Sequence, residues 1–484
     1  MNKPLARLGF LSSSHLRLSA LLLAGVTAIG FAVRGAGEPT VDRTDDVALS
    51  EAPASASCTV ALAPHAGSSR LDVDIARAQA LAADAGVLQL EALGWLFVAK
   101  ARQSYDPGFY KLAEASADCA LEIDSGSHAA KLLRGHVLYS MHRFAEAGAI
   151  AERLTTERET AFDFGLLGDV ALSQGRTQDA IVAYQRMVDL KPNLQSYSRA
   201  AHIRWLKGDL DGANELMRMA AGAGTLRDPE SQAWVWAQIA TFELQAGNLD
   251  AAHEATAVAL SAFPEHAPAL LVRGRVHLAR GEIAESVVAL ERAATLNPLP
   301  EYGWALADVL YLAGRDEAAR RVETTIETRG PIDDPRTTSL YLSTRALAAR
   351  QRDDGGDDSF GRLPDALLLA EREIEKRADV YTRDTVAWAL AASGDVEGAR
   401  DHMAGAVSEG TEDARLYLHA GVIAARAGNL GAADDWFRKA KAIEQMLLPS
   451  EQNVLERALE SLREQALNSE GRRGTEVPRQ ERMQ

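Results

Sequence analysis

Apolar and polar residues recur with a helical period of 3.6 residues from about Arg70 to Asn468. The clearest stretch runs from Ala161 to Pro192, where two short amphipathic segments meet at Gly175. Glycine permits a tight turn between them, and the closing proline cannot extend the second helix. The pattern therefore predicts an all-α chain built from pairs of short helices.

Two small residues mark each predicted helix pair. The glycine between the helices recurs at Gly175, Gly208, Gly247, Gly281, Gly314, Gly394 and Gly428. A small residue in the second helix keeps step with it at Ala180, Ala213, Ala252, Ser286, Ala319, Ala399 and Ala433. Successive glycines lie mostly 33 or 34 residues apart, with one gap of 39 and one of 80 that spans two units. Because two markers keep one spacing, the chain is predicted to be an array in which each unit packs on its neighbours.

The unit from Ala161 to Pro192 resembles the tetratricopeptide repeat, a helix-turn-helix unit of about 34 residues. The residues that match the pattern of that family are Phe164, Leu167, Gly168, Ala180, Tyr184 and Pro192. The resemblance implies a right-handed superhelical solenoid, with the first helix of each unit lining a concave face. About ten repeats fit between residues 86 and 447.

The boundaries of the array follow from where the periodicity begins and ends. Residues 70–468 are predicted to form the repeat superhelix, and the stretch from Ser450 to Asn468 is predicted to be a helix that caps its C-terminal end. Residues 469–484 are charged and contain Gly and Arg, which predicts a disordered tail.

The N-terminus lies outside the repeat pattern. Lys3, Arg7 and Arg17 precede an apolar run over residues 18–33, which is typical of a secretory signal. Residues 1–34 are therefore predicted to be either a cleaved signal peptide or an uncleaved signal-anchor helix; a buried core helix is the alternative. If uncleaved, residues 18–33 would hold the chain in the inner membrane with the rest exported. The Ala- and Arg-rich composition indicates a bacterial protein, and hence a periplasmic location.

Residues 35–69 are rich in Gly, Pro, Ser and Ala and are predicted to be a flexible linker. Cys58 lies in this linker, and Cys119 is predicted to lie on the second helix of the first repeat. In an exported protein the two cysteines could form a disulfide worth about 4 kcal/mol in the chain-entropy model. Two free thiols are equally compatible with the spacing.

Charge and motifs exclude several classes of function. The net charge of −16 disfavours a nucleic-acid partner, because an acidic surface repels phosphates. The chain has no phosphate-binding Gly-Lys motif, and His253-Glu254 lacks the second histidine of a zinc-protease motif, since Ala257 stands in its place. The acidic run at residues 353–358 lacks the order of a calcium loop. We therefore expect no metal, no cofactor and no catalytic activity.

The resemblance also implies which residues face a partner, because partner peptides contact defined positions of the first helix. These positions are occupied by Asp169, His202, Trp205, Trp234, Thr241, Arg275, Tyr381 and Trp388. Some of these residues could be core instead, and Trp304 and Tyr311 fit either role, with core preferred. The sequence thus predicts a non-catalytic scaffold that holds a protein or peptide in its groove. The alternative is an accessory subunit, or an enzyme with an unrecognised site in the array.

Overall fold

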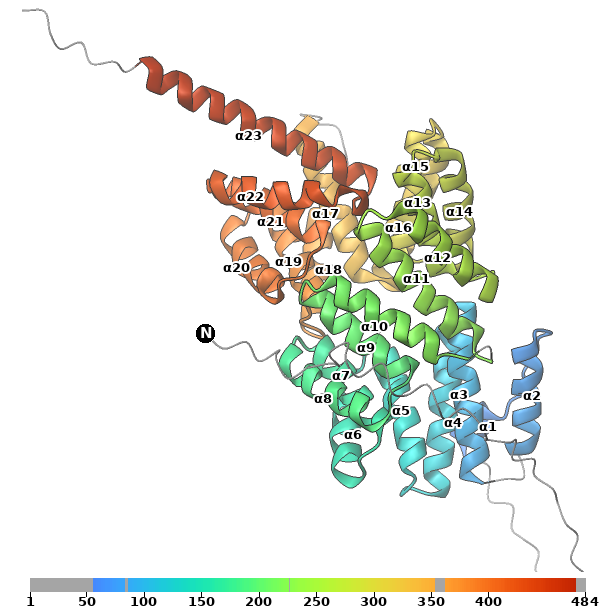
Figure 1. Ribbon diagram of the computed structural model, residues 1–484. Coiled ribbons are helices and arrows are strands. Elements are labelled where there is room, and N and C mark those ends of the chain that lie inside the picture. The colour runs from blue at the N-terminus through green and yellow to red at the C-terminus, as the bar shows by residue number, and fades with distance from the viewer. Residues whose placement is uncertain (1–54, 83–85, 226, 353–361, 476–484) are drawn as a thin grey trace, which may run out of the picture. The chain divides into compact units, whose positions relative to one another are not determined.

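The computed structural model describes residues 55–82, 86–225, 227–352 and 362–475, and every regular element in these ranges is a helix (Figure 1). The predicted signal or anchor segment lies outside the described residues. Among the described residues, no helix combines the length and the apolar composition that a membrane crossing requires.

Ten helix pairs follow one another in the described part of the chain, and the two helices of each pair pack on each other. The pairs are α3 (Val87–Ser104) with α4 (Gly108–Ile123), α5 (His128–Ser140) with α6 (Phe144–Glu157), α7 (Ala161–Ser173) with α8 (Thr177–Leu190), α9 (Leu194–Leu206) with α10 (Leu210–Ala223), α11 (Pro229–Gln245) with α12 (Leu249–Ala262), α13 (Ala267–Ala279) with α14 (Ile283–Leu296), α15 (Pro300–Leu312) with α16 (Asp316–Asp333), α17 (Pro335–Arg352) with α18 (Leu363–Ile374), α19 (Val380–Ser393) with α20 (Val396–Ala406), and α21 (Ala414–Arg426) with α22 (Leu430–Ala442). Helices α1 (Ala56–Ala61) and α2 (Arg70–Ala82) precede them, and α23 (Pro449–Thr475) follows. This confirms the predicted all-α solenoid of about ten helix-turn-helix repeats with a closing helix.

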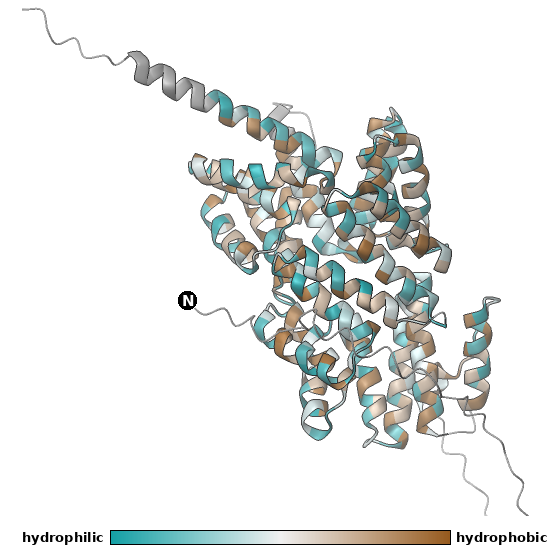
Figure 2. Ribbon diagram, in the orientation of Figure 1, coloured by the Kyte–Doolittle hydropathy of each residue, from teal (hydrophilic) through white to brown (hydrophobic). Residues whose placement is uncertain are grey.

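The small marker residues allow the two helices of a pair to approach each other closely, as predicted. A side chain at Gly168 would place its Cβ 2.3 Å from the ring of Tyr184, so only glycine lets α7 approach α8 this closely. Ala180 is completely buried in the same contact. Gly175 has a φ of +72°, the left-handed conformation that glycine adopts without strain. The helices coloured in Figure 2 carry both hydrophobic and hydrophilic residues.

The N-terminal boundary of the folded array differs from the prediction. Residues 56–69 were expected to belong to the linker, but α1 packs on α4 and Cys58 forms a disulfide with Cys119. The side-chain amide of Gln79 also donates to the carbonyls of Ala61 at 3.1 Å and Ala63 at 2.6 Å. The segment lacks the apolar periodicity of the repeats. It is ordered because the disulfide and these hydrogen bonds hold it against the array.

The C-terminal boundary is also later than predicted. Helix α23 continues to Thr475, whereas the tail was expected to begin at Ser469. Residues 476–484 lie outside the described part of the chain.

The later pairs contact the earlier pairs, which an array of nearest-neighbour units would not do. The backbone N–H of Ala378 donates to the carbonyl of Ser173 at the end of α7 (3.1 Å). The Thr411 hydroxyl donates to the carbonyl of Leu206 at the end of α9 (2.7 Å). Loops that precede α19 and α21 thus lie on the turns that follow α7 and α9, and the chain closes on itself through these contacts.

Candidate functional site

The first helices of successive pairs contact one another, as α3 contacts α5 and α5 contacts α7. We call the surface that these first helices share the inner face. Four side chains at equivalent positions of α3, α5, α7 and α9 follow each other along it: Trp95, His136, Asp169 and His202. The rings of Trp95 and His136 are 5.2 Å apart, and His202 is exposed.

Asp169, predicted to face a partner, holds three helices together instead. Its carboxylate accepts hydrogen bonds from Nε and Nη2 of Arg199 on α9, at 2.7 and 2.6 Å. The hydroxyl of Tyr184 on α8 donates to the same carboxylate at 2.7 Å. With 8% of its surface exposed and its charge paired, Asp169 offers little to a ligand. It fixes the spacing of α7, α8 and α9 beneath the exposed side chains.

The structure brings three of the predicted groove residues together. The ring of His202 stacks on Trp205 at 5.7 Å, and Trp205 stacks on Tyr381 at 6.2 Å. We call these three residues the aromatic cluster. Two of them belong to α9 and the third to α19, and the cluster forms because α19 lies against the earlier pairs. Trp205 and Tyr381 are partly exposed, so the cluster remains accessible.

Polar contacts fix the orientation of the aromatic cluster. The indole N–H of Trp205 donates to Oε1 of Gln245 at 2.8 Å, and Nε2 of Gln245 donates to the carbonyl of Glu412 at 2.7 Å. The guanidinium of Arg336 lies 5.8 Å from the centre of the Tyr381 ring. The rings are therefore held in place before any ligand arrives, which lowers the entropy cost of binding.

His136, His202 and Tyr381 are uncharged near neutral pH. Burial lowers the pKa of His136 to about 4, and desolvation also lowers the pKa of His202. Burial raises the pKa of Tyr381 well above its usual value, so its phenol stays protonated. Because Asp169 is paired with Arg199, the inner face of α3 to α9 presents aromatic rings and hydrogen-bonding groups in place of net charge.

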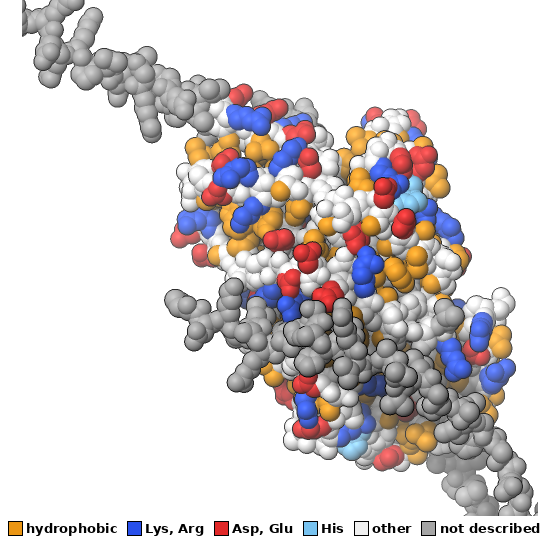
Figure 3. Space-filling view, viewed as in Figure 1, with side chains coloured by type: hydrophobic (Ala, Val, Ile, Leu, Met, Phe, Trp, Pro, Cys, Tyr) orange, Lys and Arg blue, Asp and Glu red, His pale blue; other side chains and the backbone are white. Residues whose placement is uncertain are grey.

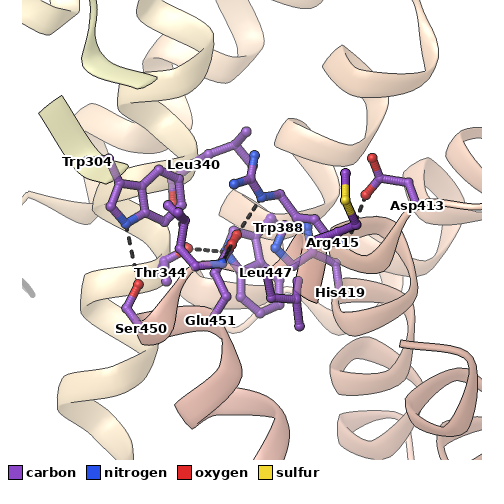
Figure 4. Close-up of polar contacts among 12 residues, drawn as sticks. Trp304, Leu340, Thr344, Trp388, Asp413, Arg415, His419, Leu447, Ser450 and Glu451 are labelled. Atoms are coloured by element: carbon purple, nitrogen blue, oxygen red, sulfur yellow. Dashed lines mark hydrogen bonds and ion pairs between the residues drawn. The ribbon is translucent and has the colours of Figure 1, made fainter. Parts of the chain in front are cut away.

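Trp388 was predicted to face the groove, and that prediction is wrong. Its side chain is fully buried, it stacks on His419 at 3.8 Å, and its indole N–H donates to Oγ1 of Thr344 at 2.9 Å (Figure 4). Helices α17, α19 and α21 pack side by side. The position that faces solvent in α9 therefore faces neighbouring helices in α19.

The remaining predicted residues have mixed surroundings. Trp234 is partly buried against the core, and the Thr241 hydroxyl donates to the carbonyl of Ala237 within its own helix. Arg275 donates to the carbonyl of Met446, so the chain itself occupies that position. Trp304 is buried, in agreement with the preferred assignment to the core. Tyr311 is 38% exposed, and its hydroxyl donates to Glu323.

Sequence reasoning missed the part of the inner face formed by α3 and α5. Trp95 and His136 occupy the same repeat position as Asp169 and His202. The sequence does indicate these two positions. Gly94 and Gly135 each come one residue before Trp95 and His136, just as Gly168 comes one residue before Asp169. Extending the residue list into these weaker units would have found them.

The charges on the surface show no dominant sign on the face drawn in Figure 3, where acidic and basic side chains are interspersed. Among the described residues, no group of three or more His, Cys, Asp or Glu is arranged to hold a metal ion. The residues described above give the inner face of α3 to α9 stacking, apolar contact and hydrogen bonding.

The chain shows a low level of similarity to several solved structures. No curated protein matches the sequence. A human IFIT1 dimer with PPP-AAAA is 15% identical, with 77% of this chain and 90% of that chain covered and a TM-score of 0.45. A tetratricopeptide repeat protein from Parabacteroides merdae is 16% identical, with 55% and 98% covered and a TM-score of 0.29. Pseudomonas aeruginosa pilF is 13% identical, with 61% and 97% covered and a TM-score of 0.26.

One family model matches part of the sequence. Residues 238–299, from the middle of α11 to the residue before α15, match the family described as Tetratricopeptide repeat. The matched stretch includes two of the marker glycines, Gly247 and Gly281. The match and the ten helix pairs together support a protein built of tetratricopeptide repeats.

Proposed function

We propose that this protein is a non-catalytic scaffold that binds a partner protein on the inner face of α3 to α9. The aromatic cluster is the observation that carries this proposal. His202 and Trp205 on α9 and Tyr381 on α19, a helix distant in sequence, stack on one another and keep exposed surface. Trp and Tyr dominate the energetic centres of protein interfaces because they bury a large area with few rotatable bonds.

The electrostatics favour a protein partner over a nucleic acid. Arg and Lys supply most of the affinity for phosphates, but Arg199 is committed to Asp169 and the guanidinium of Arg336 lies against the ring of Tyr381. The neutral histidines add no positive charge near pH 7, and the whole chain carries a net charge of −16. A partner segment with aromatic or aliphatic side chains and hydrogen-bonding groups fits this surface.

The proposal includes a location on the exported side of a bacterial membrane. The disulfide between Cys58 and Cys119 supports it, because such bonds persist mainly in oxidising compartments such as the periplasm. The basic residues and apolar run of the first 34 residues also support export. If that segment is not cleaved, residues 18–33 anchor the scaffold in the inner membrane.

The test compares three forms of the full chain in crosslinking and pull-down experiments with an envelope fraction of the source organism. The wild type and Trp436→Ala are expected to retain the same partner, with crosslinks that map to α3, α5 and α9. Trp436 is a suitable control because it is a partly exposed tryptophan on α22, paired with Tyr417 and remote from the cluster in sequence. Trp205→Ala is expected to weaken binding of the purified partner at least tenfold.

Three results would contradict the proposal. Partner binding that is equal for wild type and Trp205→Ala would remove the cluster from the interface. Tight, salt-sensitive binding of an RNA oligonucleotide without a protein partner would indicate a nucleic-acid scaffold. Turnover of a small molecule by the purified chain would favour an enzyme.

A further inference from the structure

A short segment of the chain lies across the inner face of the later pairs. The Gln445 side-chain amide donates to the carbonyls of Leu244 (3.1 Å) and Gln245 (2.9 Å) at the end of α11. The carbonyl of Met446 accepts a hydrogen bond from Arg275 on α13. One residue of the segment thus contacts the end of one first helix, and the next residue contacts the following first helix.

The second half of the segment continues in the same way. The backbone N–H of Ser450 donates to Oδ2 of Asp308 on α15 at 2.9 Å, and the Ser450 hydroxyl accepts from the indole N–H of Trp304 at 3.3 Å. Glu451 pairs with Arg415 on α21, whose guanidinium lies 5.0 Å from the centre of the Trp304 ring (Figure 4).

Apolar anchors lie between these polar contacts. Leu447 is 1% exposed and Leu448 is 5% exposed, and both belong to the core of the later pairs. Asp308 and Arg275 occupy the repeat position that in α9 carries the exposed His202. In the later pairs the segment therefore contacts, at Arg275 and Asp308, the repeat position that is open in α9. The segment runs from the 3-10 turn at Glu444–Met446 into the first turn of α23, and both its backbone and its side chains make these contacts.

We infer that the inner face of α11, α13, α15 and α21 is a peptide-binding site that residues Gln445–Glu451 occupy in cis. Its ligand class is a short protein segment of the pattern Gln-x-Leu-Leu-x-x-Glu, and a partner that carries this pattern competes with the internal segment. The inference rests on the proposed scaffold function and adds a second site to it, which adjoins the aromatic cluster at Gln245. The internal segment covers this site until such a partner displaces it.

The experiment measures binding of a fluorescein-labelled peptide with the sequence of residues 443–452 to the full chain by fluorescence anisotropy. The variant Gln445→Gly/Leu447→Ala loosens the internal segment and is expected to bind the peptide. The wild type is expected to bind it about a hundredfold more weakly, because a tethered competitor has a local concentration on the order of millimolar. Adding Arg275→Ala to the loosened variant is expected to weaken binding at least tenfold, whereas the exposed Arg292→Ala on α14 leaves it unchanged.

Hydrogen exchange of the wild type provides a second measurement that does not depend on a variant. The segment is expected to exchange faster than α13 and α15, which shows that it opens independently of them. Exchange only at the rate of global unfolding would make the segment an inseparable part of the core and overturn the inference. The inference would also be overturned if the loosened variant folds but binds no peptide, or if Arg275→Ala leaves peptide binding unchanged. Because the probe is the chain's own sequence, these results do not depend on the partner at the aromatic cluster.

Discussion

The turn glycines offer a matched test of the contact between early and late pairs. A Cβ at Gly175 would lie 2.5 Å from the carbonyl oxygen of Ala378, which belongs to the loop before α19. Gly428 has a similar left-handed backbone, with φ of +77° against +72°, but no atom lies within 4 Å of its added Cβ. Alanine at both positions suffers the same backbone strain, and only alanine at Gly175 also collides with a distant part of the chain.

The expected magnitudes separate the two effects. A non-glycine residue in the left-handed region costs about 1–2 kcal/mol, which is the whole expected loss for Gly428→Ala. At Gly175 the loop that contains Ala378 must also move away. This movement breaks the hydrogen bond from Ala378 to Ser173, which is worth about 1 kcal/mol, and disturbs the packing around it. We therefore expect Gly175→Ala to lose about 3 kcal/mol in total.

Urea denaturation followed by circular dichroism at 25 °C gives both free energies of unfolding. Hydrogen exchange at Ala378 adds a local readout, which is expected to accelerate in Gly175→Ala and to stay unchanged in Gly428→Ala. Equal losses of stability with unchanged exchange at Ala378 would refute the contact, since only that contact distinguishes the two glycines.

Three further predictions concern the disulfide, a buried ring and pH. Cys58→Ser removes the disulfide, whose cysteines are 61 residues apart, and should lower the free energy of unfolding by about 4 kcal/mol in the chain-entropy model. Protection from hydrogen exchange should then fall in α1 to α4 and persist beyond α9. Trp388→Ala leaves a cavity between α17, α19 and α21 and should lose about 3–5 kcal/mol in urea denaturation, whereas a loss under 1 kcal/mol would mean that the ring is not core. Burial raises the pKa of Asp308 to about 7, above the unfolded value of about 3.9, so its contribution to stability is present below about pH 4 and is lost as pH rises through 7. Asp308→Asn should therefore gain more thermal stability relative to the wild type at pH 8 than at pH 5, and parallel melting profiles would contradict this assignment.

The local fold could be predicted from the sequence because it depends on residue size at fixed intervals. Gly168 and Ala180 determine how closely two helices pack, and neither depends on what lies elsewhere in the chain. The closing contacts could not be predicted in this way. Ala378 and Thr411 lie in loops without a marker pattern, and they find their partners only after many pairs have stacked.

The same limit explains the mixed outcome for the groove. Trp205 and Trp388 both belong to positions that the resemblance assigns to partners, yet one is accessible and the other is buried. The difference arises because α17 and α21 place Thr344 and His419 against the ring of Trp388. Position within a repeat therefore indicates which side of a helix a residue occupies, but the later course of the chain determines whether that side meets solvent.

The contact between Thr411 and Leu206 joins residues that are 205 positions apart, and this has a consequence for biosynthesis. At about 5–20 residues per second, the ribosome needs roughly 10–40 s to deliver Thr411 after Leu206 has emerged. During that interval α9 and its turn are complete but lack the loop that later covers them. The growing chain thus passes through a partly folded state in which the turn after α9 is exposed. A translation pause or a premature stop in the second half of the chain would leave this surface accessible to chaperones and proteases.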